Sequence, residues 1–355
     1  MEELKTENKQ ITIYDIAKEA GVSPSTVSRV LTNNVNVRKE KKERILELIE
    51  KYNFKPNAFA RGLSESRSKV IGIIVADVRN PFYSQMFVAC EHAAEKMGYT
   101  VFLADSHSSL EREIDEMERL QNQRVDAILM IGGSIDHRKI SKAFVEKFSA
   151  VAQNTPIVTS SCVVDEANCF AIRINESQCM KLLLEHLIEL GHRDIAVIGG
   201  TLDISSTWEK FEQFKKQMKE YQIPIRKELM AVRGSYDFDT GFKEMNQMLD
   251  AGDIPTAVIA INDAAALGVM QAIRDHGYRI PEDISVVGYD NTLYSTLANP
   301  MLTSIDYDYE TYGERLVAIA IAAVEKTATE KMQTVEPKLV VRKSTAPAVA
   351  RQKSK

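Results

Sequence analysis

The side chains best suited to bind a ligand gather in a short N-terminal segment that combines hydroxyl, basic and turn-forming residues. Thr12 can cap a first helix with Asp15 as its reciprocal partner, and Gly21 can end that helix. Ser23 can cap a second helix that begins at Pro24, where a missing N–H costs nothing. Two short helices joined by a glycine-containing turn form a helix-turn-helix unit, whose second helix enters the major groove of DNA. The segment therefore predicts DNA binding.

The apolar spacing predicts which sides of these helices are buried. The inward positions are Ile13, Ile16, Ala17, Ala20, Val22, Val27, Val30 and Leu31, which turns Pro24, Ser25, Ser28 and Arg29 toward solvent. A third amphipathic helix follows at residues 38–52, with Ile45, Leu48, Ile49 and Tyr52 inward and Lys39, Lys41, Lys42 and Arg44 outward. A generic helical hairpin is the alternative interpretation. Three helices with one basic side favour DNA binding over it.

A very short helix is expected next, in the stretch FKPNAFARGL. Asn57 can cap it, but it has barely two turns and Gly62 costs it about 1 kcal/mol. Because a helix this short does not hold together in water by itself, it should form only when something else supports it. Leu63 at its end, close to the basic Arg61, is suited to insert into the minor groove as an apolar wedge.

Downstream of residue 69, short β-branched runs alternate with amphipathic helical periods. We expect strands at residues 70–76, 100–105, 126–131, 157–159, 170–174, 194–198, 229–233, 256–261 and 284–289. We expect helices at residues 83–97, 110–123, 178–190, 208–221, 242–249 and 264–276. This alternation predicts parallel sheets covered on both faces, a doubly wound α/β architecture. So many strands fit two sheets better than one.

Other kinds of site are not indicated. The cysteines form no C-x-x-C pair and the histidines show no zinc-binding spacing, so we expect neither disulfides nor a metal. No nucleotide-binding fingerprint follows a strand, and Gly132-Gly133 and Gly199-Gly200 predict tight strand-end turns. Ser160-Ser161 lacks a nucleophile elbow, and we expect no catalytic residue and no cofactor. With no apolar run long enough to span a membrane, the expected protein is soluble and cytoplasmic.

The net charge of −5 looks wrong for a protein that binds nucleic acid. This value averages two parts that differ, which we call the head (residues 1–69) and the body (residues 70–355). The head holds 14 Lys and Arg against 10 Asp and Glu, whereas the body holds 31 against 40. The head is therefore +4 and the body −9, so the acidic average does not exclude DNA binding.

The motifs of both parts resemble the LacI/GalR family of bacterial transcriptional regulators over nearly the whole chain. In the head these motifs are IYDIA, AGVS, TVSRVL and PNAFARGL. In the body they are NPFY, LGHR, ND, ALG, PEDISVVGYDN and LTSI. The head motifs are specific to that family, whereas the body motifs alone also fit periplasmic sugar-binding proteins. The resemblance implies an all-α helix-turn-helix head with a hinge helix, joined to an α/β periplasmic-binding-protein-like body of two doubly wound parallel-sheet subdomains.

The resemblance also implies a division of the chain. The DNA-binding domain would span residues 1–63, with the hinge helix at about 57–63, and a linker would follow at residues 64–69. The N-terminal effector subdomain would take residues 70–172 and about 308–332. The C-terminal one would take residues 173–307 and about 333–346. A disordered basic tail would occupy residues 347–355.

For DNA, the resemblance implies a dimer on a near-palindromic operator, with hinge helices that fold on the DNA. Carried over, Leu63 is the wedge, Ala60 and Arg61 line the minor groove, and Asn57 caps the hinge helix. Arg29 is placed to contact a base edge such as guanine O6/N7, and Pro24 and Ser25 occupy the positions that choose the operator. Phosphate contacts are expected from Thr12, Ser23, Thr26, Ser28 and Asn33.

For the body, the resemblance implies a small-molecule effector in the crevice between the two sheets. The expected effector-binding residues are Asn80, Phe82, Tyr83, Ser161, Trp208, Lys210, Asn262, Asp263, Asp290 and Tyr307. Aromatic rings can stack on sugar faces, while carboxylates and amides bind vicinal hydroxyls. Core packing is the alternative role for the aromatic residues, Phe82 and Tyr83 among them.

Three positions depart from the family pattern. Lys210 stands where sugar-binding relatives commonly carry an arginine, and lysine lacks the bidentate fork. Ser161 and Asn175 each stand where an aspartate is usual. An ordinary free sugar is therefore a weaker expectation than for most of the family. A modified or phosphorylated sugar, another metabolite or a protein co-regulator remain open.

The expected function is a DNA-binding transcriptional regulator, and within that class a repressor under small-molecule control. Its expected partners are a double-stranded DNA operator, a small-molecule effector and a second copy in a homodimer, with a protein co-regulator as an alternative. The expected location is the cytoplasm, on the nucleoid, with no membrane partner. A small-molecule-binding protein without DNA function is the second alternative, but it leaves the head without a role. The tail shows no leucine heptad that would predict a coiled-coil tetramer.

Overall fold

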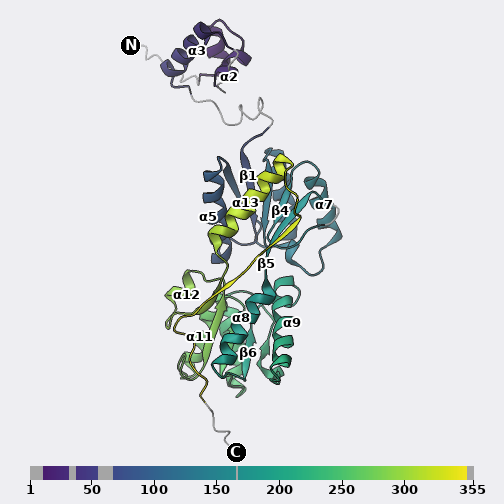
Figure 1. The fold of residues 1–355 in the computed structure, drawn as a ribbon, viewed down its shortest axis with the longest axis vertical. Coiled ribbons are helices and arrows are strands. Elements are labelled where there is room, and N and C mark those ends of the chain that lie inside the picture. Colours follow the sequence, from purple (N-terminus) through teal and green to yellow (C-terminus); the bar gives the residue numbers. More distant parts are fainter. Residues whose placement is uncertain (1–10, 32–36, 55–66, 165–166, 350–355) are drawn as a thin grey trace, which may run out of the picture. The chain divides into compact units, whose positions relative to one another are not determined.

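The fold was determined as a computed structural model, which describes residues 11–31, 37–54, 67–164 and 167–349. The chain divides into two compact units between Lys69 and Val70, the head and the body (Figure 1). The described part of the expected linker, residues 67–69, contains no helix or strand and leads directly into the first strand of the body.

The head contains three described helices, α1 (Ile13–Glu19), α2 (Pro24–Leu31) and α3 (Lys39–Lys51). The predicted capping box starts α1: the Asp15 amide donates to Thr12 Oγ1 at 3.4 Å, and the Thr12 amide donates to Asp15 Oδ2 at 2.9 Å. Gly21, with a φ of +64°, makes the turn into α2, a backbone conformation that glycine adopts without strain. The expected inward positions form the core, with Ile16, Ala17, Val27, Val30, Ile45 and Leu48 buried.

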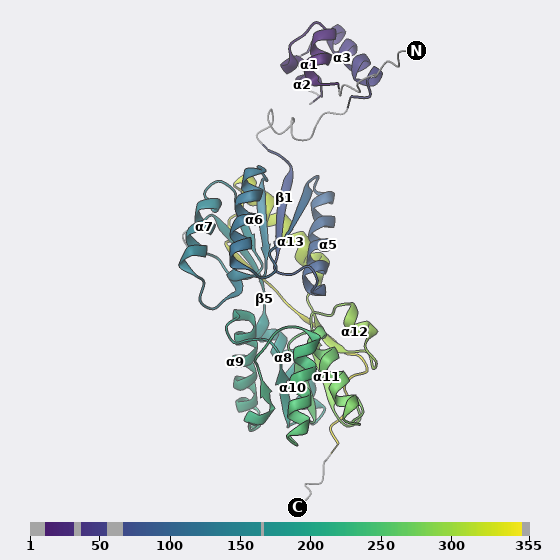
Figure 2. The ribbon, with the colours of Figure 1, turned by 180° about the vertical axis from the view of Figure 1, so that it is seen from behind.

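The body contains two six-stranded sheets. The first has the order β11-β5-β4-β3-β1-β2 and is parallel throughout. Its strands are β1 (Val70–Val75), β2 (Thr100–Asp105), β3 (Ala127–Ile131), β4 (Ile157–Thr159), β5 (Cys169–Ile174) and β11 (Met332–Val335). Its helical elements are α5 (Pro81–Lys96), α6 (Leu110–Asn122), η1 (Ser134–Asp136), α7 (Lys142–Ala152) and α13 (Tyr309–Glu325). Helices α5 and α13 cover one face, and α6 and α7 cover the other (Figures 1 and 2).

The second sheet has the order β12-β10-β9-β8-β6-β7, and only β12 runs antiparallel to its neighbour among these strands. Its strands are β6 (Ile195–Ile198), β7 (Met230–Ala231), β8 (Ala257–Ala260), β9 (Ser285–Tyr289), β10 (Thr303–Asp306) and β12 (Lys338–Val340). Its helical elements are α8 (Glu176–Glu189), α9 (Ser205–Glu220), η2 (Lys227–Leu229), α10 (Phe238–Asp250), α11 (Asp263–Asp275) and α12 (Leu293–Leu297). Helices α10 and α11 pack on one face, and α8 and α9 lie on the other (Figure 2).

The two subdomains exchange chain segments at three crossings, two of which come later than expected. Strand β5 continues to Ile174, beyond the expected boundary at 172/173. Strand β11 pairs with β5, from Met332 opposite Ala171 to Val335 opposite Ile174, so residues 333–335 belong to the first subdomain. The crossing therefore lies three residues past the expected boundary at about residue 332, because the pairing of two strands far apart in the sequence sets it.

The expected disordered tail also begins too early. The Ala348 amide donates to the carbonyl of Leu190 at 2.8 Å, and His192 Nε2 lies 3.0 Å from the carbonyl of Ala346. These contacts attach the start of the tail to the end of α8. Residues 350–355 lie outside the described residues.

Candidate functional site

The first turn of α2 in the head carries a network of hydroxyl groups. Ser23 Oγ lies 2.8 Å from Ser25 Oγ and 2.9 Å from Thr26 Oγ1, and it accepts from the Thr26 amide at 3.3 Å. The amides of a helix's first turn have no partner within the helix, and the helix dipole favours negative charge there. Hydroxyls and amides at this end together suit a phosphate oxygen.

The remaining predicted DNA contacts have different surroundings. Arg29 and Ser25 are exposed on α2, whereas Pro24 and Ser28 are half-buried. Thr12 is exposed, but its hydroxyl donates to Asp15 Oδ2 at 2.6 Å within the capping box. The predicted contacts that lie outside the described residues are Asn33, Asn57, Ala60, Arg61 and Leu63.

An acidic side chain on α1 holds α3 in place. Glu19 accepts from Lys51 Nζ at 2.8 Å and from the Tyr52 hydroxyl at 2.7 Å. The hydrogen bonds from Lys51 and Tyr52 lower the pKa of Glu19. Helix α3 packs on both α1 and α2, so these exposed contacts add to the packing that joins the three helices.

In the body, a buried ion pair lies where the two sheets meet. Lys210 of α9 is 7% exposed, and its Nζ lies 3.2 Å from Glu176 Oε2 at the start of α8. The same Nζ lies 4.5 Å from the centre of the Tyr289 ring, a cation–π distance. Glu176 Oε2 is buried and has no well-aligned hydrogen bond, so the 3.2 Å contact is an ion pair rather than a good hydrogen bond.

Two half-buried aspartates flank this pair, one from each subdomain. Asp136 belongs to η1, after β3, and hydrogen bonds to Ser161; Asp290 follows β9 and accepts from the Tyr307 hydroxyl at 3.1 Å. We call Asp136, Ser161, Glu176, Lys210 and Asp290 the junction cluster.

The pKa values of both aspartates of the junction cluster are raised. Burial raises the pKa of Asp136 to about 6, against the hydrogen bond from Ser161, and the carboxylate of Glu176 raises it further. Burial also raises the pKa of Asp290 to about 6, although Lys210 opposes that shift. Carboxyl groups with raised pKa values, contributed by two subdomains to one place, are typical of a ligand site, because a purely structural core avoids buried charges of this kind.

Aromatic side chains line the same junction. The Phe82 ring lies 5.1 Å from Tyr83 and 6.0 Å from Tyr307, both edge to face. Tyr83 lies close enough to Asp136 and Asp290 for both to raise its pKa, after burial. Its ring packs against Gly132, where a Cβ atom would lie 2.6 Å from the ring. The Gly132-Gly133 turn predicted from the sequence is thus what lets Tyr83 approach.

A second set of contacts joins the two subdomains near the only tryptophan in the sequence. His137 forms an isolated antiparallel bridge with Ile204, and the Arg138 amide donates to the carbonyl of Asp203 at 2.9 Å. The Arg138 guanidinium lies 4.5 Å from the centre of the half-buried Trp208 ring. The contact between Arg138 and Trp208 therefore joins the two subdomains.

Three of the predicted effector residues have structural partners instead. Asn80 caps α5, accepting from the Phe82 amide at 3.0 Å. Asn262 caps α11 and donates to the carbonyl of Tyr236 at 2.9 Å. Asp263 is 0% exposed and accepts three hydrogen bonds, from the amide and hydroxyl of Thr292 and the hydroxyl of Ser304, at 2.6 to 2.9 Å. We therefore leave these three out of the ligand site.

Sequence reasoning missed Asp136, Glu176 and Tyr236. Glu176 is adjacent to Asn175, which was noted as a departure, and Asp136 lies just after the Gly132-Gly133 turn, so both follow strand ends where ligands bind. The Tyr236 hydroxyl lies 2.7 Å from Thr207 Oγ1, one residue before Trp208. Tyr236 lies three residues after the strand expected at residues 229–233, so the same signal, a position after a strand end, could have found it.

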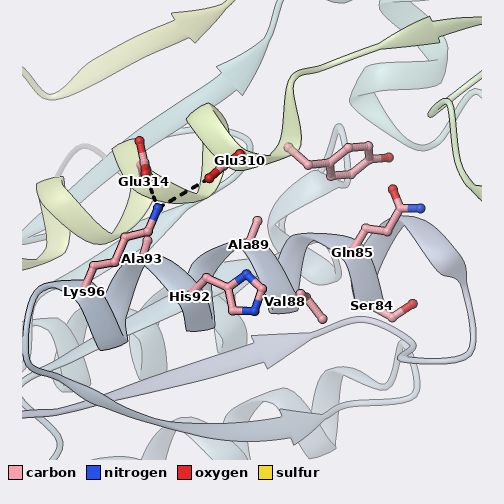
Figure 3. A pocket seen from close by; sticks show the side chains of 10 residues that line it. Ser84, Gln85, Val88, Ala89, His92, Ala93, Lys96, Glu310 and Glu314 are labelled. Atoms are coloured by element: carbon pink, nitrogen blue, oxygen red, sulfur yellow. Dashed lines mark hydrogen bonds and ion pairs between the residues drawn. The ribbon is translucent and has the colours of Figure 1, made fainter.

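A separate surface pocket of about 550 Å³ lies between α5 and α13 (Figure 3). Its lysine and glutamates are Lys96, Glu310 and Glu314. Lys96 Nζ lies 3.0 Å from Glu314 Oε1 and 3.4 Å from Glu310 Oε1, and Figure 3 marks both contacts. None of the junction cluster lines it. Among the described residues no group of histidine, cysteine and acidic side chains could hold a metal ion, and no helix there is long and apolar enough to cross a membrane.

Comparison with known proteins agrees with this architecture. Residues 12–57 match the "Bacterial regulatory proteins, lacI family", and residues 184–345 match the "Periplasmic binding protein-like domain". The HTH-type transcriptional repressor PurR of Pasteurella multocida (strain Pm70) is 32% identical over 334 residues, 94% of this chain and 98% of PurR. Catabolite control protein A of Priestia megaterium is 31% identical over 296 residues, 83% of this chain and 87% of that protein.

Solved structures give the same result. The lac repressor dimer bound to operator and the anti-inducer ONPF has a TM-score of 0.84 at 30% identity, covering 95% of this chain and all of that one. The complex of the transcriptional regulator CelR with cellobiose has a TM-score of 0.68 at 25% identity, covering 94% and 99%.

A helix-turn-helix head on a two-sheet periplasmic-binding-like body defines a class of DNA-binding transcriptional regulators. The chain belongs to the lacI family of bacterial regulatory proteins. The expected family and fold class are therefore confirmed.

Proposed function

We propose that the chain represses transcription as a homodimer on a near-palindromic operator, and that a small molecule bound at the junction cluster changes its affinity for that operator. The observation that carries the proposal is the junction cluster itself, because two subdomains contribute charged, perturbed side chains to one place. A ligand there can bias the separation of the subdomains, and linkage makes that bias act on DNA binding. A palindrome requires a two-fold symmetric dimer.

In the head, we propose that Arg29 contacts a base edge and that Pro24 and Ser25 choose the operator. Ser23 and Thr26 contact phosphates. Support comes from the exposure of Arg29 and from the hydroxyl network at the N-terminus of α2. A base contact contributes to sequence specificity, whereas a phosphate contact contributes to affinity for any DNA.

The test is a gel-shift titration on a palindromic operator fragment and on random DNA, at several salt concentrations. Arg29→Ala should weaken operator binding about tenfold or more and change random-DNA binding far less. Lys39→Ala is the matched control, since Lys39 is also a cation of the head and its side chain is 89% exposed. Equal losses on operator and random DNA for Arg29→Ala would place Arg29 on the phosphate backbone instead.

We further propose Leu63 as the minor-groove wedge, on the strength of its position at the end of the short predicted hinge helix. Leu63→Ala should weaken operator binding while salt-sensitive binding to random DNA stays nearly intact. Equal losses on both DNAs would contradict that role.

A protein co-regulator is the second candidate for control, and the open pocket between α5 and α13 is the surface that favours it. The two candidates differ in their response to substitutions. Val88→Glu on the exposed part of α5 should abolish control by a protein partner and leave control by a small molecule unchanged.

A further inference from the structure

The junction cluster holds more negative than positive charge. Asp136, Glu176 and Asp290 contribute three carboxyl groups, and Lys210 is the cation whose charge acts on all three. Lys210 is already 3.2 Å from Glu176 and packs on the face of Tyr289. When all four groups are ionised, the two aspartates are left without a cation of their own among the described residues around them.

The cluster also has more hydrogen-bond acceptors than donors. Asp136 accepts from Ser161 and Asp290 from Tyr307, which leaves each carboxylate with further acceptor positions. Glu176, whose side chain is 10% exposed, has a buried Oε2 without an aligned donor. Its ion-pair partner is Lys210 Nζ at 3.2 Å, so this oxygen keeps acceptor capacity for a donor of a bound ligand.

Building on the proposed function, we infer that the effector of this protein carries a protonated amine, which binds between Asp136 and Asp290, and that a phosphorylated effector is excluded. An ammonium group supplies three donors and one positive charge, which is what the cluster lacks. A phosphate brings negative charge and only acceptors at neutral pH, so it would face two carboxylates without a counter-charge.

The titration of the two aspartates agrees with this inference. Each has a pKa of about 6, so each takes up a proton at a pH where an ordinary carboxyl group stays ionised. A proton neutralises a buried carboxylate, and an ammonium partner does the same without a chemical change. Burial is the largest cause of both shifts, so pairing with a cation would offset a desolvation cost at these two side chains.

The neighbouring side chains indicate what the rest of the ligand is. Lys210 has spare donors and the hydroxyls of Tyr83 and Tyr236 lie nearby, a set that suits ligand hydroxyl groups. The rings of Phe82 and Trp208 supply flat apolar faces. Hydroxyls and a flat face on a cationic molecule describe an amino sugar or another polyhydroxylated amine.

The test uses the full chain and three matched sets of probes, based on glucosamine, galactosamine and mannosamine. Each set holds the amine, the sugar with a hydroxyl in place of the amine, the N-acetylated amine, and the 6-phosphate of the sugar. Binding is measured by calorimetry and by the emission of Trp208, which reports on the body alone. At least one amine should bind tenfold or more tightly than its three counterparts. Asp136→Asn and Asp290→Asn should each remove that preference, and Asp115→Asn on the exposed side of α6 should keep it.

Three results would overturn the inference. These are a neutral or phosphorylated probe that binds as tightly as its amine, an amine preference that survives both aspartate substitutions, and a panel in which no amine binds. Gel shifts with the same probes separate this inference from the proposed function. An amine that binds with the expected preference but leaves operator affinity unchanged contradicts only the proposed control, whereas a phosphorylated probe that changes operator affinity contradicts only the inference.

Discussion

Asp136→Asn should raise the free energy of unfolding of the body, although it replaces a carboxylate that accepts a hydrogen bond from Ser161 with an uncharged amide. Burial raises the pKa of this carboxyl group from 3.8 to about 6. Between about pH 4 and pH 6 the folded state therefore binds more protons than the unfolded state, and the stability of the native protein falls as the pH rises through that window. Two pKa units correspond to about 3 kcal/mol at most.

Part of that gain is lost to solvent access, because Asp136 is half-buried rather than fully enclosed. We expect Asp136→Asn to raise the free energy of unfolding by about 1–2 kcal/mol at pH 7.5, or the Tm by roughly 3–6 °C. The Ser161 hydroxyl can still donate to the amide oxygen of asparagine, so the hydrogen bond is kept. At pH 4.5 the gain should shrink by more than half, since the native carboxyl group is then protonated.

The assay is urea and thermal unfolding followed by tryptophan fluorescence, because Trp208 is the only tryptophan and lies in the body. Asp136→Glu keeps the charge and Asp115→Asn removes an exposed one, so neither should reproduce the gain at pH 7.5. A loss of stability at pH 7.5, or an equal gain at pH 4.5, would refute the reasoning.

By the same assay Asp263→Asn should lower the free energy of unfolding by about 2 kcal/mol at pH 4.5, because an amide nitrogen cannot accept the hydrogen bonds that Asp263 receives in the core. The loss should be smaller at pH 7.5, because burial raises the pKa of Asp263 to about 7 and so already disfavours the native carboxylate there. Lys210→Met should lower the free energy of unfolding by about 3 kcal/mol, since it removes the ion-pair partner of the buried Glu176, and adding Glu176→Gln should recover most of the loss. Thr12→Ala should lower the stability of the head by about 1 kcal/mol, seen as faster amide hydrogen exchange in α1, and Thr12→Ser should not. A cost of Lys210→Met that persists in the double variant, or unchanged exchange in Thr12→Ala, would contradict the corresponding argument.

Local signals predicted the helices and most strands closely. The capping box, the turn at Gly21 and the start of α2 at Pro24 depend on residues within four positions of one another, so they are visible in the sequence. Most of the expected strands and helices of the body lie within about three residues of those found. Strand β7, expected at residues 229–233, is shorter and spans only Met230–Ala231, because it lies at the sheet edge and pairs with β6 alone. Strands β10, β11 and β12 were not among the expected strands.

Elements that depend on distant partners were harder to predict. Strand β11 pairs with β5 although about 160 residues separate them, and its half-exposed sequence gives no strong apolar pattern. Helices α7 and α13 were not among the predicted periods. The crossings between subdomains follow these pairings, which is why two of the three predicted boundaries were too early.

By itself the sequence determined the family, the two-part organisation and the α/β class of the body, because short-range caps, turns and hydrophobic periods carry that information. It also showed that the usual aspartate at the end of β4 is Ser161. Only the tertiary structure showed that a carboxylate nevertheless reaches Ser161, from Asp136 at the end of η1. It also separated Asp263, whose oxygens are all occupied in the core, from Asp290, which retains acceptor capacity at the junction. Two aspartates that follow strand ends look alike in a sequence, and their roles differ because the folded chain surrounds them differently.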